Sequence, residues 1–576
     1  MVSRFQPWFG KGLLRGRYPF AILAGLLMAA AFPKIGIAGL AWIGPGLLLA
    51  STLGTSRMET LRIGYIGGLA YYLAGLYWLL AIPYRWHGIP LGPAAGWLAL
   101  SAYLALYPAA WVGLVSSLHR SNYKVDRGER PAERSENVTP ALTEILPGRW
   151  AQRLLWTLYG AATWVALEMI VARLFSGFPW DLFGVSQYQM LPLIQIVSFT
   201  GVYGISFLLI WVSLSLLSAV VMLVRQPAQR GVWIAETILP ILVVALIFNF
   251  GLRQLRHADK PTRTINVTFV QPSIPQTLIW DPRQDDERFR RLIQLSEQAL
   301  TNKTDLLLWP EAGIPKLLRY DKDIFEAVTG LARKHHIWLM VGSDDAEPLR
   351  NSTNPNDAEY FNSSFLIDPK GRLANGYKKR NLVIFGEYVP LARWLPFMKF
   401  LTPISGGFTP GDRPVPFELT DLKVKTAPLI CFEDVFPQLV RECAEPETDF
   451  LVNMTNDGWF GETAAPWQHA TTAFFRAVEN HLPLLRCTNT GLTCWVDAQG
   501  RLRQLCRDQG GTVYGPGIMT AEIPLLPIGE RRPGTFYNQH GDLFGWTCVA
   551  VTAIILAWQI VSRLCSGSRA LEPEST

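Results

Sequence analysis

The stretch Ala427-Pro428-Leu429-Ile430-Cys431-Phe432-Glu433-Asp434 joins an apolar run to a thiol and two carboxylates. The apolar residues predict a buried strand that ends near Cys431. A free thiol in such a strand is most often an inert core residue. A packed cysteine needs no polar neighbours, so the two carboxylates favour a different interpretation, in which Cys431 is a nucleophile at the end of a strand.

The chain around this stretch is too long and too apolar for one soluble domain. Of its 576 residues 49% are hydrophobic, which predicts several membrane spans joined to a soluble domain. The formal net charge of +7 is modest, and the basic residues cluster beside apolar segments, which favours membrane orientation over nucleic-acid binding. None of the seven cysteines has a metal-site spacing, so we expect neither metal nor cofactor. Whether Cys487 and Cys494 form a disulfide is a question that the sequence leaves open.

Eight apolar runs have the length of about 20 residues that crosses a bilayer core of about 30 Å. They cover residues 18–32, 35–53, 63–82, 91–118, 154–175, 202–223, 232–250 and 543–561. The first run could be a signal peptide, but the seven later runs favour a retained helix. Lys and Arg gather on one side of the spans, which predicts that this side is cytoplasmic and that the region 251–542 is exported.

This pattern divides the chain into four parts. Residues 1–250 form a seven-helix membrane part, 264–527 a catalytic domain, 543–562 the eighth transmembrane helix and 563–576 a cytoplasmic tail. The membrane part contains a polar insertion at 119–153, predicted to be cytoplasmic and partly disordered. Glu168 is its deepest charge, and it is either functional or paired within the bundle.

The exported domain has the alternating pattern of an α/β layered fold. Period-two and short apolar runs predict strands at 265–271, 305–309, 337–342, 361–367, 427–431, 450–454, 484–488, 492–496 and 518–523. Apolar stripes of helical period predict helices at 286–300, 322–335 and 463–480.

Three polar sites at strand ends or in the loops between elements of this domain make an acyl-transfer site together. Glu311 follows Trp309-Pro310, Lys378 and Lys379 follow Tyr377, and Cys431 ends its strand. A thiol with a pKa near ~8.5 needs a base to become a nucleophile, which Glu311 can provide. One lysine can stabilise the oxyanion of a tetrahedral intermediate, because neighbouring side chains of an extended segment point in opposite directions. No histidine has a comparable context, which disfavours a cysteine–histidine site.

The motifs around these residues resemble the nitrilase superfamily. They are Trp309-Pro310-Glu311, the segment from Tyr377-Lys378-Lys379-Arg380 to Gly386-Glu387-Tyr388, and Ile430-Cys431-Phe432-Glu433. Three further motifs resemble its apolipoprotein N-acyltransferase branch: Gln271-Pro272-Ser273 with Trp280-Asp281, Asn456-Asp457-Gly458-Trp459-Phe460, and Pro466-Trp467-Gln468-His469. The order of seven spans, domain and eighth span resembles that branch as well.

The resemblance implies an α-β-β-α sandwich for the domain and a role for each matching residue. Glu311 resembles the general base, Lys379 the oxyanion-stabilising lysine, and Cys431 the nucleophile that becomes a thioester. Supporting and substrate-binding roles fall on Glu387, Glu433, Trp280, Tyr388 and Trp459. Asn381 and Ile384 depart from the family pattern, which puts the shape of the lysine loop in doubt. The apolar stretch 388–410 is expected either to form a lid on the bilayer or to pack into the domain core.

The predicted function is therefore acyl transfer at a membrane. The resemblance implies a phospholipid acyl donor and a diacylated apolipoprotein acceptor, with a monomeric enzyme in the bacterial inner membrane whose domain faces the periplasm. Two alternatives stay open. One is a membrane-tethered amidase or other carbon–nitrogen hydrolase, which the same three catalytic residues allow. The other is a transporter or scaffold with a binding domain, for which Glu168 is the main support.

Overall fold

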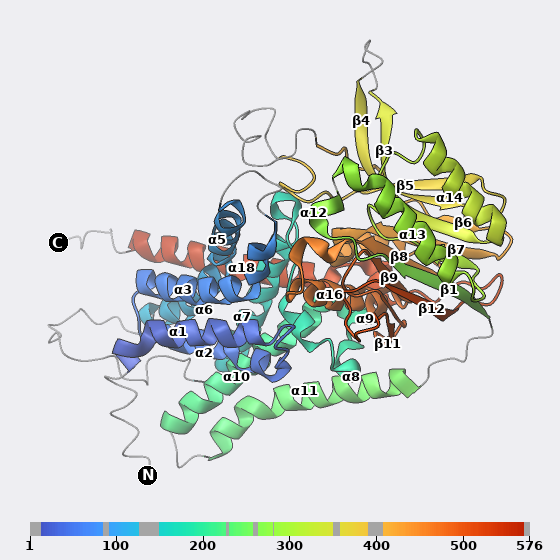
Figure 1. The fold of residues 1–576 in the computed structure, drawn as a ribbon. Helices are drawn as coiled ribbons and strands as arrows, with labels where there is room; N and C mark the ends of the chain where they lie inside the picture. The colour runs from blue at the N-terminus through green and yellow to red at the C-terminus, as the bar shows by residue number, and fades with distance from the viewer. Residues whose placement is uncertain are drawn as a thin grey trace, which may run out of the picture.

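The computed structural model describes residues 13–83, 91–125, 149–225, 230–256, 263–279, 281–349, 357–389 and 407–569. A group of helices from the N-terminal half of the chain, joined by the red C-terminal helix, lies beside a domain built on two β-sheets (Figure 1). The predicted insertion at 119–153 and the apolar stretch 388–410 fall largely outside the described residues, as does Trp280.

Apolar helices dominate the first part of the chain. The longer ones are α1 (Leu13–Ala30), α3 (Arg57–Gly75), α5 (Gly92–Leu104), α6 (Leu106–Val125), α7 (Trp150–Val171), α10 (Val202–Arg225), α11 (Arg230–Arg256) and the C-terminal α18 (Leu543–Arg569). Five segments of the described chain are long and apolar enough to cross a membrane: Gly92–Ser117, Trp150–Val171, Val202–Val224, Trp233–Arg256 and Leu543–Cys565. They correspond to the fourth to eighth predicted spans.

The first three predicted spans look different. The second, at 35–53, is wrong as one continuous helix, because it forms the 3-10 helix η3 (Ala38–Trp42) and the eight-residue α2 (Gly44–Ser51). A left-handed Gly36 (φ 68°) precedes η3, and Pro45 lies in the first turn of α2. Eight residues extend only about 12 Å, so α2 alone does not cross a bilayer. Helix α1 is short, and α3 begins with charged residues.

Glu168 has partners within the helical part. Its Oε1 accepts hydrogen bonds from the Trp164 indole at 2.9 Å and from the Phe183 backbone N–H at 2.7 Å. These bonds tie α7 to the segment that follows it.

The domain contains two six-stranded sheets. The first has the order β12-β1-β2-β3-β4-β5, with β1 (Thr264–Gln271), β2 (Leu306–Leu308), β3 (Trp338–Pro348), β4 (Ala358–Ile367), β5 (Leu373–Lys378) and β12 (Gly517–Pro524). The second has the order β11-β10-β9-β8-β7-β6, with β6 (Phe417–Leu419), β7 (Val424–Ile430), β8 (Phe450–Thr455), β9 (Leu484–Thr488), β10 (Cys494–Val496) and β11 (Leu502–Leu505). The predicted strands are confirmed, whereas the edge strands β5, β6 and β11 are not foreseen by the sequence pattern. Cys487 and Cys494 are free thiols.

Helices cover both sheets and make four layers. The sheets pack face to face through apolar side chains such as Phe269, Leu308 and Met454. Helices α13 (Asp285–Ala299) and α14 (Lys322–His335) cover the outer face of the first sheet. Helices α15 (Pro437–Cys443) and α16 (Ala465–Asn480) cover the second sheet. This arrangement confirms the predicted α-β-β-α sandwich beside a helical region.

Helix α16 is the contact layer between the domain and the membrane part (Figure 1). The side-chain carbonyl of Gln468 accepts hydrogen bonds from the Trp78 and Trp180 indoles, both at 2.9 Å. Its amide donates to the backbone carbonyls of Pro33 and Gly75, at 3.1 and 3.2 Å. One buried side chain thus joins the domain to three separate segments of the helical part.

Replacement of Gln468 by alanine is expected to lower the melting temperature of the detergent-solubilised protein by several degrees. The change leaves two indole N–H groups and two carbonyls without their partner, and each unsatisfied buried group costs about 1–3 kcal/mol. Gln294, an exposed glutamine on α13, provides the matched control. Equal melting temperatures for Gln468→Ala and Gln294→Ala would contradict this role.

Candidate active site

Three of the predicted site residues converge where strands of both sheets end. Glu311 follows β2, Lys379 follows β5 and Cys431 follows β7. The Lys379 ammonium lies 3.5 Å from Glu311 Oε1 and 2.8 Å from Glu387 Oε1. Lys378, by contrast, points away and pairs with Glu347 at 2.6 Å. The alternation of an extended strand therefore selects Lys379, only 1% exposed, as the lysine of the site.

Asn362 on β4 completes this group, and sequence reasoning missed it. Its side-chain amide donates to Glu311 Oε1 at 2.8 Å and to Glu387 Oε1 at 2.9 Å. Its backbone carbonyl accepts from the Lys379 N–H at 2.8 Å. One asparagine thus separates the two carboxylates and fixes the lysine. A single asparagine inside an apolar strand carries no sequence motif that would reveal this.

Cys431 adopts a strained backbone conformation at the start of the 3-10 helix η10 (Cys431–Val435). Its φ is 53°, in the left-handed region that costs a residue other than glycine about 1–3 kcal/mol. Such strain at a strand-to-helix turn is characteristic of exposed nucleophiles. The Asn453 amide holds the turn by donating to the Cys431 carbonyl at 2.9 Å. As a residue Cys431 is partly exposed, unlike the buried Cys443 and Cys487.

Glu433 links the lysine segment to the nucleophile turn. Its carboxylate is fully buried and accepts hydrogen bonds from the Tyr377 hydroxyl at 2.8 and 2.9 Å. It also accepts from the Arg380 N–H at 2.6 Å and the Ile430 N–H at 2.8 Å. Because Tyr377 belongs to one sheet and Ile430 to the other, Glu433 fixes the spacing between Lys379 and Cys431.

Glu387 closes the lysine loop in a similar way. One of its oxygens bonds to Lys379, and the other accepts from the Val383 N–H at 2.8 Å. Phe385 takes a left-handed φ of 60° between them, and its N–H donates to the Tyr388 carbonyl at 2.8 Å. The loop around Ile384 is therefore a closed turn held by its own glutamate.

The electrostatics of the group leave a protonated thiol beside a base. Burial raises the pKa of the Cys431 thiol well above its usual range, with Glu311 adding to the effect and Lys379 opposing it. Burial also raises the pKa of Glu311, which Lys379 and the Cys431 side chain offset in part. For Lys379 burial opposes the charge, but Glu387 and Glu311 outweigh it and raise the pKa. Lys379 is therefore a permanent cation.

Asp344 on β3 is a further carboxyl group that the sequence did not reveal. Burial, together with the nearby negative charges of Glu311 and Glu387, raises its pKa to about 7. Carboxyl groups thus outnumber cations in this region. One of these carboxyl groups therefore readily holds a proton at neutral pH.

The nucleophile turn touches the membrane part directly. The Phe432 ring lies 6.0 Å from the Trp180 ring and 6.2 Å from Phe178. The Tyr388 hydroxyl lies 2.8 Å from the Ser176 hydroxyl. Trp459 lies in η11 (Asp457–Phe460), whose Phe460 packs edge-on against Trp78 at 4.6 Å. Cys431 thus lies at the junction of the domain with the apolar helices.

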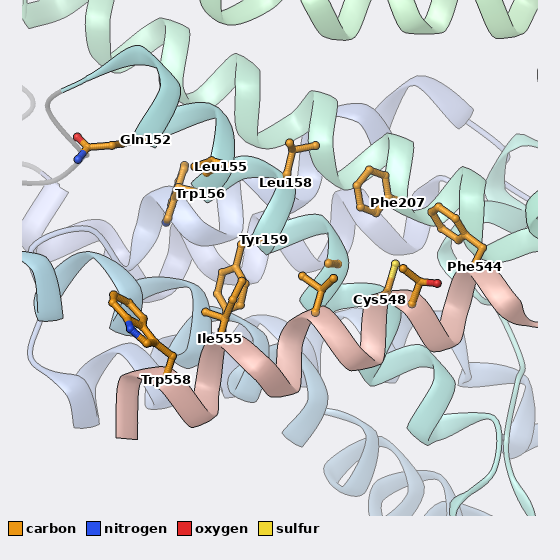
Figure 2. Close-up of a pocket in the computed structure, with 13 residues that line it drawn as sticks. Gln152, Leu155, Trp156, Leu158, Tyr159, Phe207, Phe544, Cys548, Ile555 and Trp558 are labelled. Atoms are coloured by element: carbon orange, nitrogen blue, oxygen red, sulfur yellow. The ribbon is translucent and has the colours of Figure 1, made fainter. Parts of the chain in front are cut away.

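A separate apolar groove of about 550 Å³ lies among the membrane helices (Figure 2). Helices α7, α10 and α18 line it with side chains such as Trp156, Phe207, Phe544 and Trp558. Neither Glu311, Lys379 nor Cys431 lines this groove, so it is distinct from the catalytic group.

Two family models match the chain and cover its two parts. Residues 24–215 match the apolipoprotein N-acyltransferase N-terminal domain, and residues 266–532 match the carbon-nitrogen hydrolase family. The second match covers both sheets and all three residues of the catalytic group.

Curated relatives match nearly the full chain. An apolipoprotein N-acyltransferase of Geobacter metallireducens is 34% identical over 550 residues, which cover 94% of this chain and 95% of that protein. The corresponding protein of Haemophilus influenzae is 29% identical and covers 84% of this chain and 85% of its own length. That of Rickettsia prowazekii is 30% identical, with 87% and 90% covered. With both parts matched and their order preserved, the chain belongs to the apolipoprotein N-acyltransferase family.

Proposed function

We propose that this protein transfers an acyl chain from a phospholipid to the N-terminal amine of the diacylglyceryl-cysteine of an apolipoprotein, through a thioester on Cys431. The observation that carries the proposal is the position of Cys431, which lies beside Glu311 and Lys379 while its neighbour Phe432 packs on Trp180 of the membrane part. The family membership supports the identity of both substrates.

The first step forms the thioester. Glu311 takes the thiol proton as the Cys431 sulfur attacks the ester carbonyl of the phospholipid. Negative charge develops on the carbonyl oxygen, and the Lys379 ammonium, held in place by Glu387 and Asn362, stabilises it. The intermediate then collapses, the carbon–oxygen bond breaks, and Glu311 returns its proton to the departing lysophospholipid alcohol.

The second step regenerates the thiol. The acceptor amine attacks the thioester carbonyl, Glu311 accepts a proton from the amine, and the carbon–sulfur bond breaks as the amide forms. The sulfur leaves as a thiolate, which recovers its proton from Glu311. Because the raised pKa of Cys431 favours the thiol, free enzyme returns to its protonated resting form. Water must be kept out of the site between the steps, since it would hydrolyse the thioester.

The membrane arrangement completes the proposal. We place the chain in the bacterial inner membrane as a monomer whose long apolar helices span the bilayer, with the domain on the periplasmic side. Five apolar helices support this, and α11 and α18 leave most of their apolar residues uncovered by protein, as lipid-facing helices do. Tethering the domain to the membrane raises the effective concentration of lipidic substrates at Cys431.

Replacement of Cys431 by alanine is expected to abolish transfer, because it removes the sulfur that carries the acyl chain in the proposed mechanism. The measurement is mass spectrometry of a diacylated lipopeptide incubated with phospholipid vesicles and purified protein. Cys565→Ala, at an exposed cysteine on α18, should transfer normally. Triacylated lipopeptide formed by Cys431→Ala would rule out the proposed nucleophile.

The two adjacent lysines are expected to respond very differently to substitution. Lys379→Met removes the cation beside the oxyanion and should slow acylation of Cys431 by about 10²–10³-fold. Lys378→Met breaks a partly exposed pair with Glu347 and a contact with the Phe361 ring, and should leave the rate within a factor of a few. Single-turnover acylation measures both. Equal rates for the two variants would show that Lys379 is not the oxyanion-stabilising group.

Glu433→Gln is expected to slow acylation about 100-fold, since a misplacement of about 1 Å between nucleophile and cation has an effect of this size. The new amide cannot accept all the N–H groups that the carboxylate accepts. Glu442 offers a matched control, because its exposed carboxylate also contacts Arg380, at 2.7 Å. Glu442→Gln should acylate normally, and a Glu433→Gln protein as fast as this control would refute the positioning role.

A further inference from the structure

A cluster of four buried charged groups lies behind the nucleophile turn. Asp434 belongs to η10, Asp457 to η11, His469 to α16 and Arg486 to β9. None of these side chains is more than 2% exposed. Buried charges are costly unless they are paired, so the pairing within this cluster decides its stability.

Both nitrogens of the His469 ring face aspartate oxygens. Nε2 lies 2.8 Å from Asp434 Oδ1, and Nδ1 lies 2.8 Å from Asp457 Oδ1. Arg486 pairs with the second oxygen of Asp434 and lies 3.6 Å from that of Asp457. An ionised carboxylate only accepts hydrogen bonds, so both ring nitrogens must carry a proton. The geometry therefore requires the imidazolium form of His469.

The charge count leads to the same result. Two aspartates and one arginine leave one negative charge, which only a protonated His469 balances. The charged groups that face His469 are Asp434, Asp457 and Arg486, and the titratable thiols of Cys494 on β10 and of Cys431 act on Arg486. Burial opposes the charge of His469, but the two aspartates outweigh burial and Arg486 and raise its pKa to about 9.

The cluster touches both sides of the active site. Asp434 lies three residues after Cys431 in the same turn. Asp457 lies two residues after Thr455, whose side chain is beside the Cys431 thiol. On the other side, the His469 ring lies 5.4 Å from the Trp180 ring, and its neighbour Gln468 binds Trp78 and Trp180. His469 thus stands between the nucleophile turn and the membrane part.

We propose that His469, held as a cation between Asp434 and Asp457, is a positioning residue that keeps the strained turn of Cys431 in its reactive conformation against the membrane part. The inference rests on the proposed role of Cys431 as nucleophile. His469 is not a catalytic base, because both of its ring nitrogens are bonded to aspartates. The cluster instead fixes the chain on either side of the thiol.

The pH dependence follows from the sign of the pKa change. His469 has a higher pKa in the folded protein than the value of about 6.5 of an unfolded histidine. Its contribution is therefore complete below pH 6.5 and is lost as the pH rises through about 9. Acylation of Cys431 by the wild-type protein is expected to fall reversibly across pH 8–10, without unfolding.

Three variants test the inference through the rate of single-turnover acylation from phospholipid vesicles. His469→Gln should slow acylation at least tenfold at pH 7, with little change in the phospholipid KM. The acylation rate of this variant should no longer fall between pH 8 and 10. His336→Gln, at an exposed histidine that directly follows α14, should behave as wild type. His469→Gln/Asp457→Asn restores the charge balance and should recover at least part of the lost rate, which a purely space-filling role would not predict.

Several outcomes would overturn the inference. These are a wild-type acylation rate that stays constant from pH 7 to 10, a His469→Gln protein with the wild-type rate, and a double variant no faster than His469→Gln. If His469→Gln does not fold, the wild-type pH profile and the double variant decide the question. A wild-type protein that forms no acyl-Cys431 at all would instead contradict the proposed function.

Discussion

The buried carboxylate of Glu433 is the constraint on which the active site depends. It accepts hydrogen bonds from Tyr377 and Arg380, which belong to the lysine segment, and from Ile430, which ends the nucleophile strand. These groups come from different sheets, so a single carboxylate sets the distance between the lysine segment of one sheet and the nucleophile strand of the other. Hydrogen bonds to a charged acceptor contribute about 1.5–3 kcal/mol each, which offsets the cost of burying the charge. The reactive groups themselves are free to face the substrate.

A second constraint holds the site against the bilayer part of the chain. Helix α16 packs on the second sheet with one face and on the membrane helices with the other. Gln468 bonds to three segments of the helical part, and the Glu479 carboxylate accepts from the Val202 N–H at 2.9 Å, at the start of α10. A carboxylate at a helix N-terminus is favoured by the helix dipole. The domain is thus joined to the membrane helices by buried polar bonds in addition to apolar packing.

Much of this arrangement could be predicted from the sequence, because periodicity and motifs report on local structure. The strand at 450–454 and the helix at 322–335 were visible as apolar patterns. Glu311 and Cys431 were visible at the ends of predicted strands, and Lys379 as part of a basic run. The choice of Lys379 over Lys378 needed the family resemblance, and the structure supplies the physical reason, since Lys378 points to Glu347. The prediction of one span at 35–53 was wrong because high hydropathy alone does not reveal the break between η3 and α2.

The unpredicted features depend on contacts between residues far apart in the chain. Asn362 and Asp344 acquire their significance only when β3 and β4 bring them beside Glu311 and Glu387. The left-handed backbone conformation of Cys431 cannot be recognised from the amino-acid sequence. His469 had no catalytic context in the sequence, yet it lies between two aspartates that follow different strands.

The thioester on Cys431 is the central claim, and peptide mass spectrometry tests it most directly. Wild-type protein incubated with phospholipid vesicles, without any amine acceptor, should yield a Cys431 peptide heavier by one acyl chain. The added mass should disappear with hydroxylamine or after a diacylated lipopeptide is added. A Cys431 peptide that stays unmodified while lipopeptide acylation proceeds at its full rate would contradict the thioester mechanism.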